Sequence, residues 1–230
     1  VIVNAGRALV VDPAWEPDEM SGLAAELADR HWQVTAGFST HAHHDHLLWH
    51  HDLGVVPRWA SARSCALVAE HHDDLLAVLG DWPWPESFGQ VSPLVGDCVP
   101  NPFGADGPEE AIDVITHDGH APGHSALWIP DRKVLIAGDM LSDIELPLPF
   151  WPDDLPAYLA GLDLLAPHVE RAEVLIPGHG TPTEEPAARL SADRGYLEAT
   201  IAGRPVKDAR LDHPGMRANH EHLVSMIRGG

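Results

Sequence analysis

Four candidate metal ligands lie within six residues, and this run constrains the chain more than any other feature. It has the pattern H-x-H-x-D-H and comprises His41, His43, Asp45 and His46. One tetrahedral ion cannot take all four ligands from so short a segment without severe backbone strain, so the run predicts two neighbouring metal ions. Histidine is also abundant elsewhere, since the 17 histidines outnumber the 14 lysines and arginines.

Three further candidate ligands come from distant parts of the chain. They are His124 in a Pro-Gly-His-Ser segment, Asp139 in Ala-Gly-Asp-Met, and His179 in Pro-Gly-His-Gly. Each lies just past a predicted strand or in a turn beside one, and loops held by a rigid sheet often carry function. Imidazole and carboxylate ligands suit Zn²⁺, although iron and manganese use similar donors.

The pattern of apolar residues predicts an α/β fold, because strands alternate with helices along the chain. The predicted strands are 1–4, 7–11, 33–39, 112–116, 126–129, 133–137 and 173–176. The predicted helices are 18–30, a short one at 46–53, 61–79 with Ser61 as N-cap, 155–166, 184–202 and 216–228. Residues 80–110 and 140–153, which are rich in proline and glycine, are expected to be irregular.

The seven candidate ligands, taken in order, resemble the pattern of the metallo-β-lactamase-fold superfamily, and Asp12-Pro13 after an early strand is also typical of it. The resemblance covers residues 1–180. It implies a four-layer αβ/βα sandwich with metals at one edge, a catalytic domain over 1–180, and a C-terminal helical extension of the same domain over 181–230. Two residues depart from the pattern: Ala14 replaces the usual glycine, and His44 is an extra imidazole that is expected to face away.

The resemblance also implies which residues hold which metal. His41, His43 and His124 would bind the first ion, Asp45, His46 and His179 the second, and Asp139 would bridge two Zn²⁺ ions. Asp12 and the Thr40 hydroxyl are expected to lie behind the ligands and fix their orientation. His120 is nearer to this set than the other remaining histidines and is a candidate to lie behind the ligands, whereas His50 and His51 are expected to be exposed or satisfied in the core.

The predicted reaction is hydrolysis of an ester, lactone or thioester by a metal-bridging hydroxide, as in glyoxalase II and lactonases of this superfamily. Asp45 and Asp139 are the predicted catalytic residues, with Asp139 orienting the water and carrying a proton. His46 argues against a dedicated β-lactamase, and His43 argues against a flavodiiron protein. The alternatives are a phosphodiesterase, a mononuclear iron persulfide dioxygenase that uses His41, His43 and His124, and a non-catalytic metal-binding module.

The charge of the chain restricts its partners. With 35 acidic and 14 basic residues the net charge is −21, which repels phosphate backbones and anionic lipids. We therefore expect a small-molecule substrate and neither a nucleic-acid nor a membrane partner. No signal peptide is visible, and the two cysteines form no CxxC pair, which together predict a cytoplasmic protein. Residues 181–230 are interpreted as either a substrate lid or an element that forms a homo-oligomer.

Overall fold

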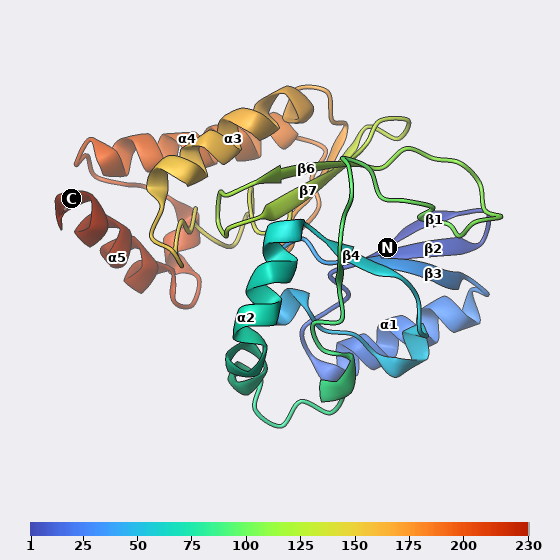
Figure 1. The fold of residues 1–230 in the computed structure, drawn as a ribbon. Helices are drawn as coiled ribbons and strands as arrows, with labels where there is room; N and C mark the ends of the chain where they lie inside the picture. Colours follow the sequence, from blue (N-terminus) through green and yellow to red (C-terminus); the bar gives the residue numbers. More distant parts are fainter. Residues whose placement is uncertain (230) are drawn as a thin grey trace. The chain divides into compact units, whose positions relative to one another are not determined.

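The computed structural model describes residues 1–229 (Figure 1). By their internal contacts these residues divide into two compact units. The first unit contains residues 1–116 and 122–125, and the second contains residues 117–121 and those from 126 onward.

The first unit is built on a five-stranded sheet in the order β1-β2-β3-β4-β5. Its strands are β1 (Ile2–Asn4), β2 (Arg7–Val11), β3 (Gln33–Phe38), β4 (Arg58–Ala60) and β5 (Ser92–Pro93). β1 is antiparallel to β2, and the other neighbours are parallel. Val11 lies opposite Phe38, so β2 and β3 end at the same edge of the sheet. The three predicted strands before residue 40 are thereby confirmed.

Two helices complete the first unit, α1 (Pro17–Asp29) and α2 (Ala62–Val78). They bury apolar residues in one cluster with the sheet, including Val10 of β2, Met20 and Leu27 of α1, and Val68 and Leu75 of α2. α2 begins after Ser61, whose hydroxyl accepts a hydrogen bond from the Ser64 backbone N–H at 3.0 Å. This confirms the predicted N-cap, which satisfies one of the amide groups that a helix start leaves without a partner.

Some local predictions were wrong. The segment 46–53 is not one helix but parts of two 3₁₀ turns, His44–His46 and His51–Leu53. The physical reason is a new cap at His50, whose Nδ1 accepts from the Asp52 backbone N–H at 3.0 Å and starts the second turn. β4 was not predicted at all, and β5 and a 3₁₀ turn at Pro85–Ser87 lie inside the segment expected to be irregular.

The second unit combines a sheet with three helices. β7 (His124–Ile129) pairs antiparallel with β8 (Val134–Ile136), which pairs parallel with β9 (Val174–Ile176). The helices are α3 (Leu155–Val169), α4 (Pro186–Ile201) and α5 (Met216–Gly229), and α4 contacts both others (Figure 1). These elements confirm the predicted strands and helices, as does β6 (Asp113–His117) at the boundary of the units.

One helix of the second unit is longer than predicted. α3 continues past residue 166 to Val169, with Pro167 in its last turn. A proline near a helix end removes only one hydrogen bond, and the buried residues Leu162, Leu165 and Val169 keep this face of the helix in the core. Residues 140–153 contain no helix or strand, as predicted.

Candidate metal centre

The shared edge of β2 and β3 brings Asp12 to Thr40. The Thr40 backbone N–H donates to Asp12 Oδ1 at 2.9 Å, and the Thr40 hydroxyl donates to Asp12 Oδ2 at 2.6 Å. The Asp12 backbone N–H in turn donates to the Phe38 carbonyl at 3.1 Å. The turn that follows β3, which carries the H-x-H-x-D-H run, is therefore anchored at its first residue by the end of β2.

Asp12 and Thr40 also lie against the rings of two histidines, and they determine the protonated nitrogen of one of them. The Thr40 hydroxyl hydrogen goes to Asp12, so its oxygen accepts from His41 Nδ1, which lies 3.0 Å away. His46 Nδ1 lies 3.0 Å from Asp12 Oδ2, so the same carboxylate is next to a second histidine ring. For His41, protonation at Nδ1 leaves Nε2 as the lone-pair nitrogen, the arrangement that partners behind a metal-binding histidine usually impose.

The predicted ligands of the first unit lie together. The ring centroid of the fully buried His41 is 4.4 Å from that of His43, 4.0 Å from that of His46 and 5.0 Å from that of His124. Asp45 Oδ2 lies 3.2 Å from His46 Nε2. His44 instead packs its ring edge against Trp15, with centroids 5.5 Å apart.

Hydrogen bonds of the two residues that flank His124 hold it next to this group. The carbonyl of the preceding Gly123 accepts hydrogen bonds from the hydroxyls of Ser61 and Ser64 at 2.6 and 3.0 Å. The Ser125 backbone N–H donates to the Thr40 carbonyl at 2.8 Å. Both neighbours of His124 are thus attached, one to the first turn of α2 and the other to the start of the histidine run.

The second unit carries the other two predicted ligands, Asp139 and His179. The parallel strands β8 and β9 end at the same edge, where the Gly178 backbone N–H donates to the Gly138 carbonyl at 2.7 Å. His179 Nε2 lies 3.4 Å from Asp139 Oδ2. Asp139 is buried, and a buried carboxylate is costly without cationic or hydrogen-bonding neighbours, so its location suits a metal-binding role.

His120 lies next to the predicted ligand Asp139, as its place in the sequence indicated. Its Nε2 lies 3.4 Å from Asp139 Oδ2, and its ring is buried. The backbone of His120 has a φ of +67°, a turn conformation that no periodic pattern reveals. Nearby, burial lowers the pKa of His117 to about 4, and His117 Nδ1 accepts from the Gly119 backbone N–H at 3.1 Å. The G-H-x-P-G-H spacing was the only sequence signal for His120.

A separate cluster of His50, His51 and Asp52 has metal-ligand residue types but is already satisfied. The Ser21 hydroxyl donates to the Pro17 carbonyl, so it accepts from His50 Nε2 at 3.2 Å. His50 Nδ1 accepts from the Asp52 backbone N–H. Because both ring nitrogens have partners, His50 acts as a neutral structural residue, as expected from the sequence.

The donors in the two units are imidazole nitrogens and carboxylate oxygens, a combination that fits a divalent metal ion. The matching family profile, described as "Metallo-beta-lactamase superfamily", covers residues 1–179. The chain belongs to this superfamily. The predicted α/β fold with C-terminal helices is confirmed by this match and by solved structures of the same fold.

Two solved structures illustrate the similarity of fold. A metallo-beta-lactamase family protein from Thermus thermophilus aligns with a TM-score of 0.66 and 21% identity, over 97% of this chain and 85% of that chain. A metallo-beta-lactamase from Pontibacter korlensis aligns with a TM-score of 0.62 and 18% identity, over 83% of this chain and 81% of that chain. At these identities the likeness shows the fold alone.

A curated relative is nearer in sequence. A hydroxyacylglutathione hydrolase from Thermosynechococcus vestitus is 32% identical over 143 residues, which is 60% of this chain. The match covers 45% of the relative, less than half of its length.

None of the helices in residues 1–229 is long and apolar enough to cross a membrane.

Proposed function

We propose that this chain is a metal-dependent hydrolase that holds two zinc ions and cleaves an ester, lactone or thioester. The observation that carries the proposal is the complete donor set, which lies in two groups at strand ends or in the turns next to them. The superfamily match over residues 1–179 spans both groups, so we assign them to one centre. The assigned ligands are His41, His43, Asp45, His46, His124, Asp139 and His179.

We divide the ligands as the superfamily pattern implies. His41, His43 and His124 would hold one ion, Asp45, His46 and His179 would hold the other, and Asp139 would serve both. This division rests on the superfamily pattern, because the His41 ring lies near those of His43, His46 and His124 alike, while Asp139 lies next to His179. His120, beside the same carboxylate, is assigned as a residue that orients Asp139.

Zinc in such a centre supplies a water of lowered pKa and polarises the substrate carbonyl. Asp139 orients the attacking water and holds the proton that is released when its oxygen bonds to the acyl carbon. Asp139 then returns this proton to the departing alkoxide or thiolate as the acyl bond breaks. The products are a carboxylic acid and an alcohol or thiol. Asp45 is assigned as the second catalytic carboxylate, beside His46.

The choice of an acyl substrate rests on two observations. The curated relative is named for hydrolysis of an acyl derivative of glutathione, which makes a thioester a leading candidate. The net charge of −21 disfavours the polyanionic phosphodiester backbones of nucleic acids by electrostatic repulsion. A small molecule is therefore the proposed substrate.

The test combines elemental analysis of the purified chain with a panel of lactones, esters and thioesters that includes a hydroxyacylglutathione. We expect about two zinc ions per chain and hydrolysis that is lost on chelation. D139N should lower kcat by about 10²–10⁴-fold. H44A is the matched control from the same motif, since His44 packs on Trp15 rather than joining the ligand group.

Other outcomes would overturn the proposal. One iron ion per chain, oxygen uptake and no hydrolysis would instead indicate the persulfide dioxygenase branch. Two bound metal ions without turnover of any substrate in the panel would indicate a non-catalytic metal-binding module. A phosphodiester as the preferred substrate would show that the charge argument was wrong.

A further inference from the structure

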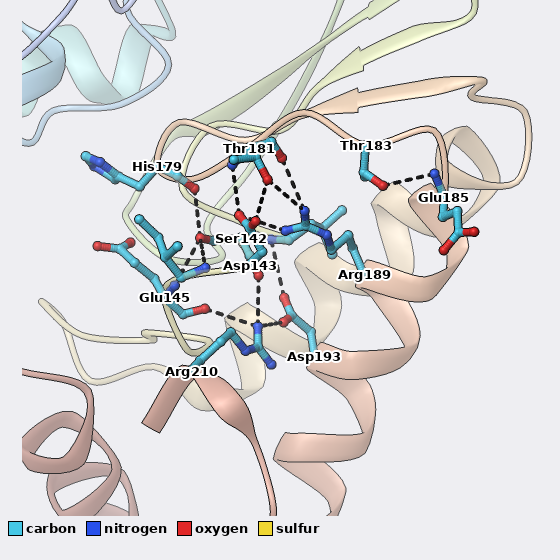
Figure 2. Close-up of polar contacts among 12 residues, drawn as sticks. Ser142, Asp143, Glu145, His179, Thr181, Thr183, Glu185, Arg189, Asp193 and Arg210 are labelled. Atoms are coloured by element: carbon cyan, nitrogen blue, oxygen red, sulfur yellow. Dashed lines mark hydrogen bonds and ion pairs between the residues drawn. The ribbon is translucent and has the colours of Figure 1, made fainter. Parts of the chain in front are cut away.

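A buried arginine connects the C-terminal part of the chain to the loop after Asp139. Arg210 lies in the 3₁₀ turn Ala209–Asp212 and is 5% exposed. Its Nη1 donates to the carbonyls of Ser142 and Glu145, each at 3.1 Å, and to Asp193 Oδ1 at 2.5 Å (Figure 2). Its Nε and Nη2 donate to Asp208 at 3.0 and 2.8 Å. Each of its three nitrogens therefore has a carbonyl or carboxylate partner.

Asp193 attaches the same loop from a second side. It lies in α4, is 1% exposed, and accepts through Oδ2 from the Leu141 backbone N–H at 3.3 Å. Leu141 is only two residues after Asp139 and has a φ of +64°, a strained conformation for a leucine. Arg210 and Asp193 thus hold both ends of the segment 141–145.

The segment 141–145 in turn holds the turn that carries His179. The Ser142 hydroxyl donates to the His179 carbonyl at 2.8 Å. Asp143 accepts from the Thr181 backbone N–H at 2.9 Å and forms an ion pair with Arg189 of α4 at 2.9 Å (Figure 2). Burial opposes ionisation of Asp143, yet the hydrogen bonds from Arg189 and Thr181 hold the pKa of this carboxyl well below its usual range.

The approach of the two segments is close enough to require glycine at position 180. Gly180 has a φ of +108°, and a Cβ there would lie 2.0 Å from Asp143 Oδ1. The backbone of the His179 turn therefore rests directly on the Asp143 carboxylate. A displacement of the segment 141–145 would be transmitted to the His179 turn.

We propose that Arg210, together with Asp193, is a positioning residue that holds Asp139 and His179 in place to bind metal. This inference rests on the proposed function, in which these two residues are ligands. The region after residue 180 would then help to build the metal centre. This role differs from the two interpretations of that region given above, a substrate lid and an element that forms a homo-oligomer.

The energetics favour positioning over simple stabilisation. Burial raises the pKa of Asp193 to about 6 in spite of its contact with Arg210, so keeping this carboxylate charged in the core is costly. Buried ion pairs are often replaced by apolar residues of similar volume without loss of stability. What an apolar pair cannot reproduce is the set of directed hydrogen bonds from one planar guanidinium to two backbone carbonyls and two carboxylates.

The test compares R210M, R210K and the apolar double variant R210M/D193L with the full wild-type chain. Zinc dissociation constants come from competition with a chromogenic chelator, and thermal unfolding is followed on metal-free protein. We expect R210M to bind zinc about 10–100-fold more weakly, as for lost partners behind a ligand. R210K should recover little, because an ammonium cannot span these acceptors. The double variant should recover part of the stability that metal-free R210M loses, because it also removes the unpaired buried charge of Asp193, but it should not recover the zinc affinity.

The matched control is R194Q, one residue from Asp193 in α4, whose guanidinium forms an exposed pair with Asp163. It should bind zinc as the wild type does. Wild-type zinc affinity in folded R210M, or in the double variant, would overturn the positioning role and leave the proposed function intact. A wild-type chain that binds no zinc would overturn the proposed function itself.

Discussion

Replacement of Gly123 by alanine is expected to destabilise the first unit and disturb the neighbouring ligand His124. Gly123 has a φ of +78°, and an added Cβ would lie 2.6 Å from Ser61 Oγ and 2.9 Å from the Ser64 backbone nitrogen. The second of these atoms is backbone in the first turn of α2, so it cannot move away as a flexible side chain could. The Gly123 segment itself must therefore shift.

The magnitude follows from what that shift breaks. An alanine in the left-handed region costs about 1–2 kcal/mol. Displacement of the Gly123 carbonyl also weakens its hydrogen bonds from Ser61 and Ser64, each contributing about 1 kcal/mol. We expect G123A to lower the free energy of unfolding by about 3–4 kcal/mol, the sum of these terms.

A control variant separates the cost of positive φ from the cost of the steric clash between the added Cβ and α2. Gly80 has a φ of +62° at the end of α2, but no atom lies within 4 Å of a Cβ placed there. G80A should therefore cost only the conformational term of about 1–2 kcal/mol. Urea unfolding of the metal-free proteins measures both values, and chelator competition measures zinc affinity, which only G123A should reduce. Equal losses of stability in the two variants would refute the collision argument.

Three more predictions concern the metal and the pH. D12N should weaken zinc binding about 10–100-fold, because the carboxylate 3.0 Å from His46 Nδ1 is lost. Chelator competition measures the affinity, and an unchanged value would show that this contact does not support zinc binding. Saturating zinc at about 100 times its dissociation constant should stabilise the protein by about 2.7 kcal/mol; a melting temperature that chelation leaves unchanged would contradict this. The lowered pKa of His117, about 4 in the fold against 6.5 in the unfolded chain, means that the unfolded state takes up the proton first as the pH falls. Metal-free wild type should therefore lose about 3 kcal/mol more than H117N between pH 6.5 and 4, and parallel pH profiles would exclude His117 as the cause.

Local patterns predicted the fold wherever one short segment contains the whole signal. The apolar runs of β2 and β3 and the hydroxyl of Ser61 before α2 are such cases. β4 is different, because its first residue, Arg58, is a buried cation. Arg58 donates to the carbonyls of Ser87 and Leu47 at 2.7 and 3.1 Å and stacks on Trp49. These partners are distant in sequence. From the sequence alone, Arg58 would therefore be taken for an exposed charged residue.

The candidate site divides in the same way. The run from His41 to His46 is contiguous, so its residue types and spacing predict metal binding without a structure. The contact of His120 with Asp139 depends on a turn with positive φ, and the contacts of Arg210 span up to 68 residues. In the sequence, Arg210 stands out only as a basic residue without a cluster. The assignment of the seven ligands to two zinc ions remains a prediction.

The two ligand groups are supported by different kinds of structure, and this difference has a physical reason. In the first unit, Asp12 and Thr40 lie at the ends of adjacent parallel strands, so the sheet itself orients His41 and His46. In the second unit, the residues after Asp139 form a loop with three prolines and no sheet partners. Such a loop has no ladder of backbone hydrogen bonds to determine its course. The missing partners are an acceptor in α4, the Asp193 carboxylate, and a donor in the 3₁₀ turn, the Arg210 guanidinium. This explains why costly buried charges stand there instead of an apolar contact.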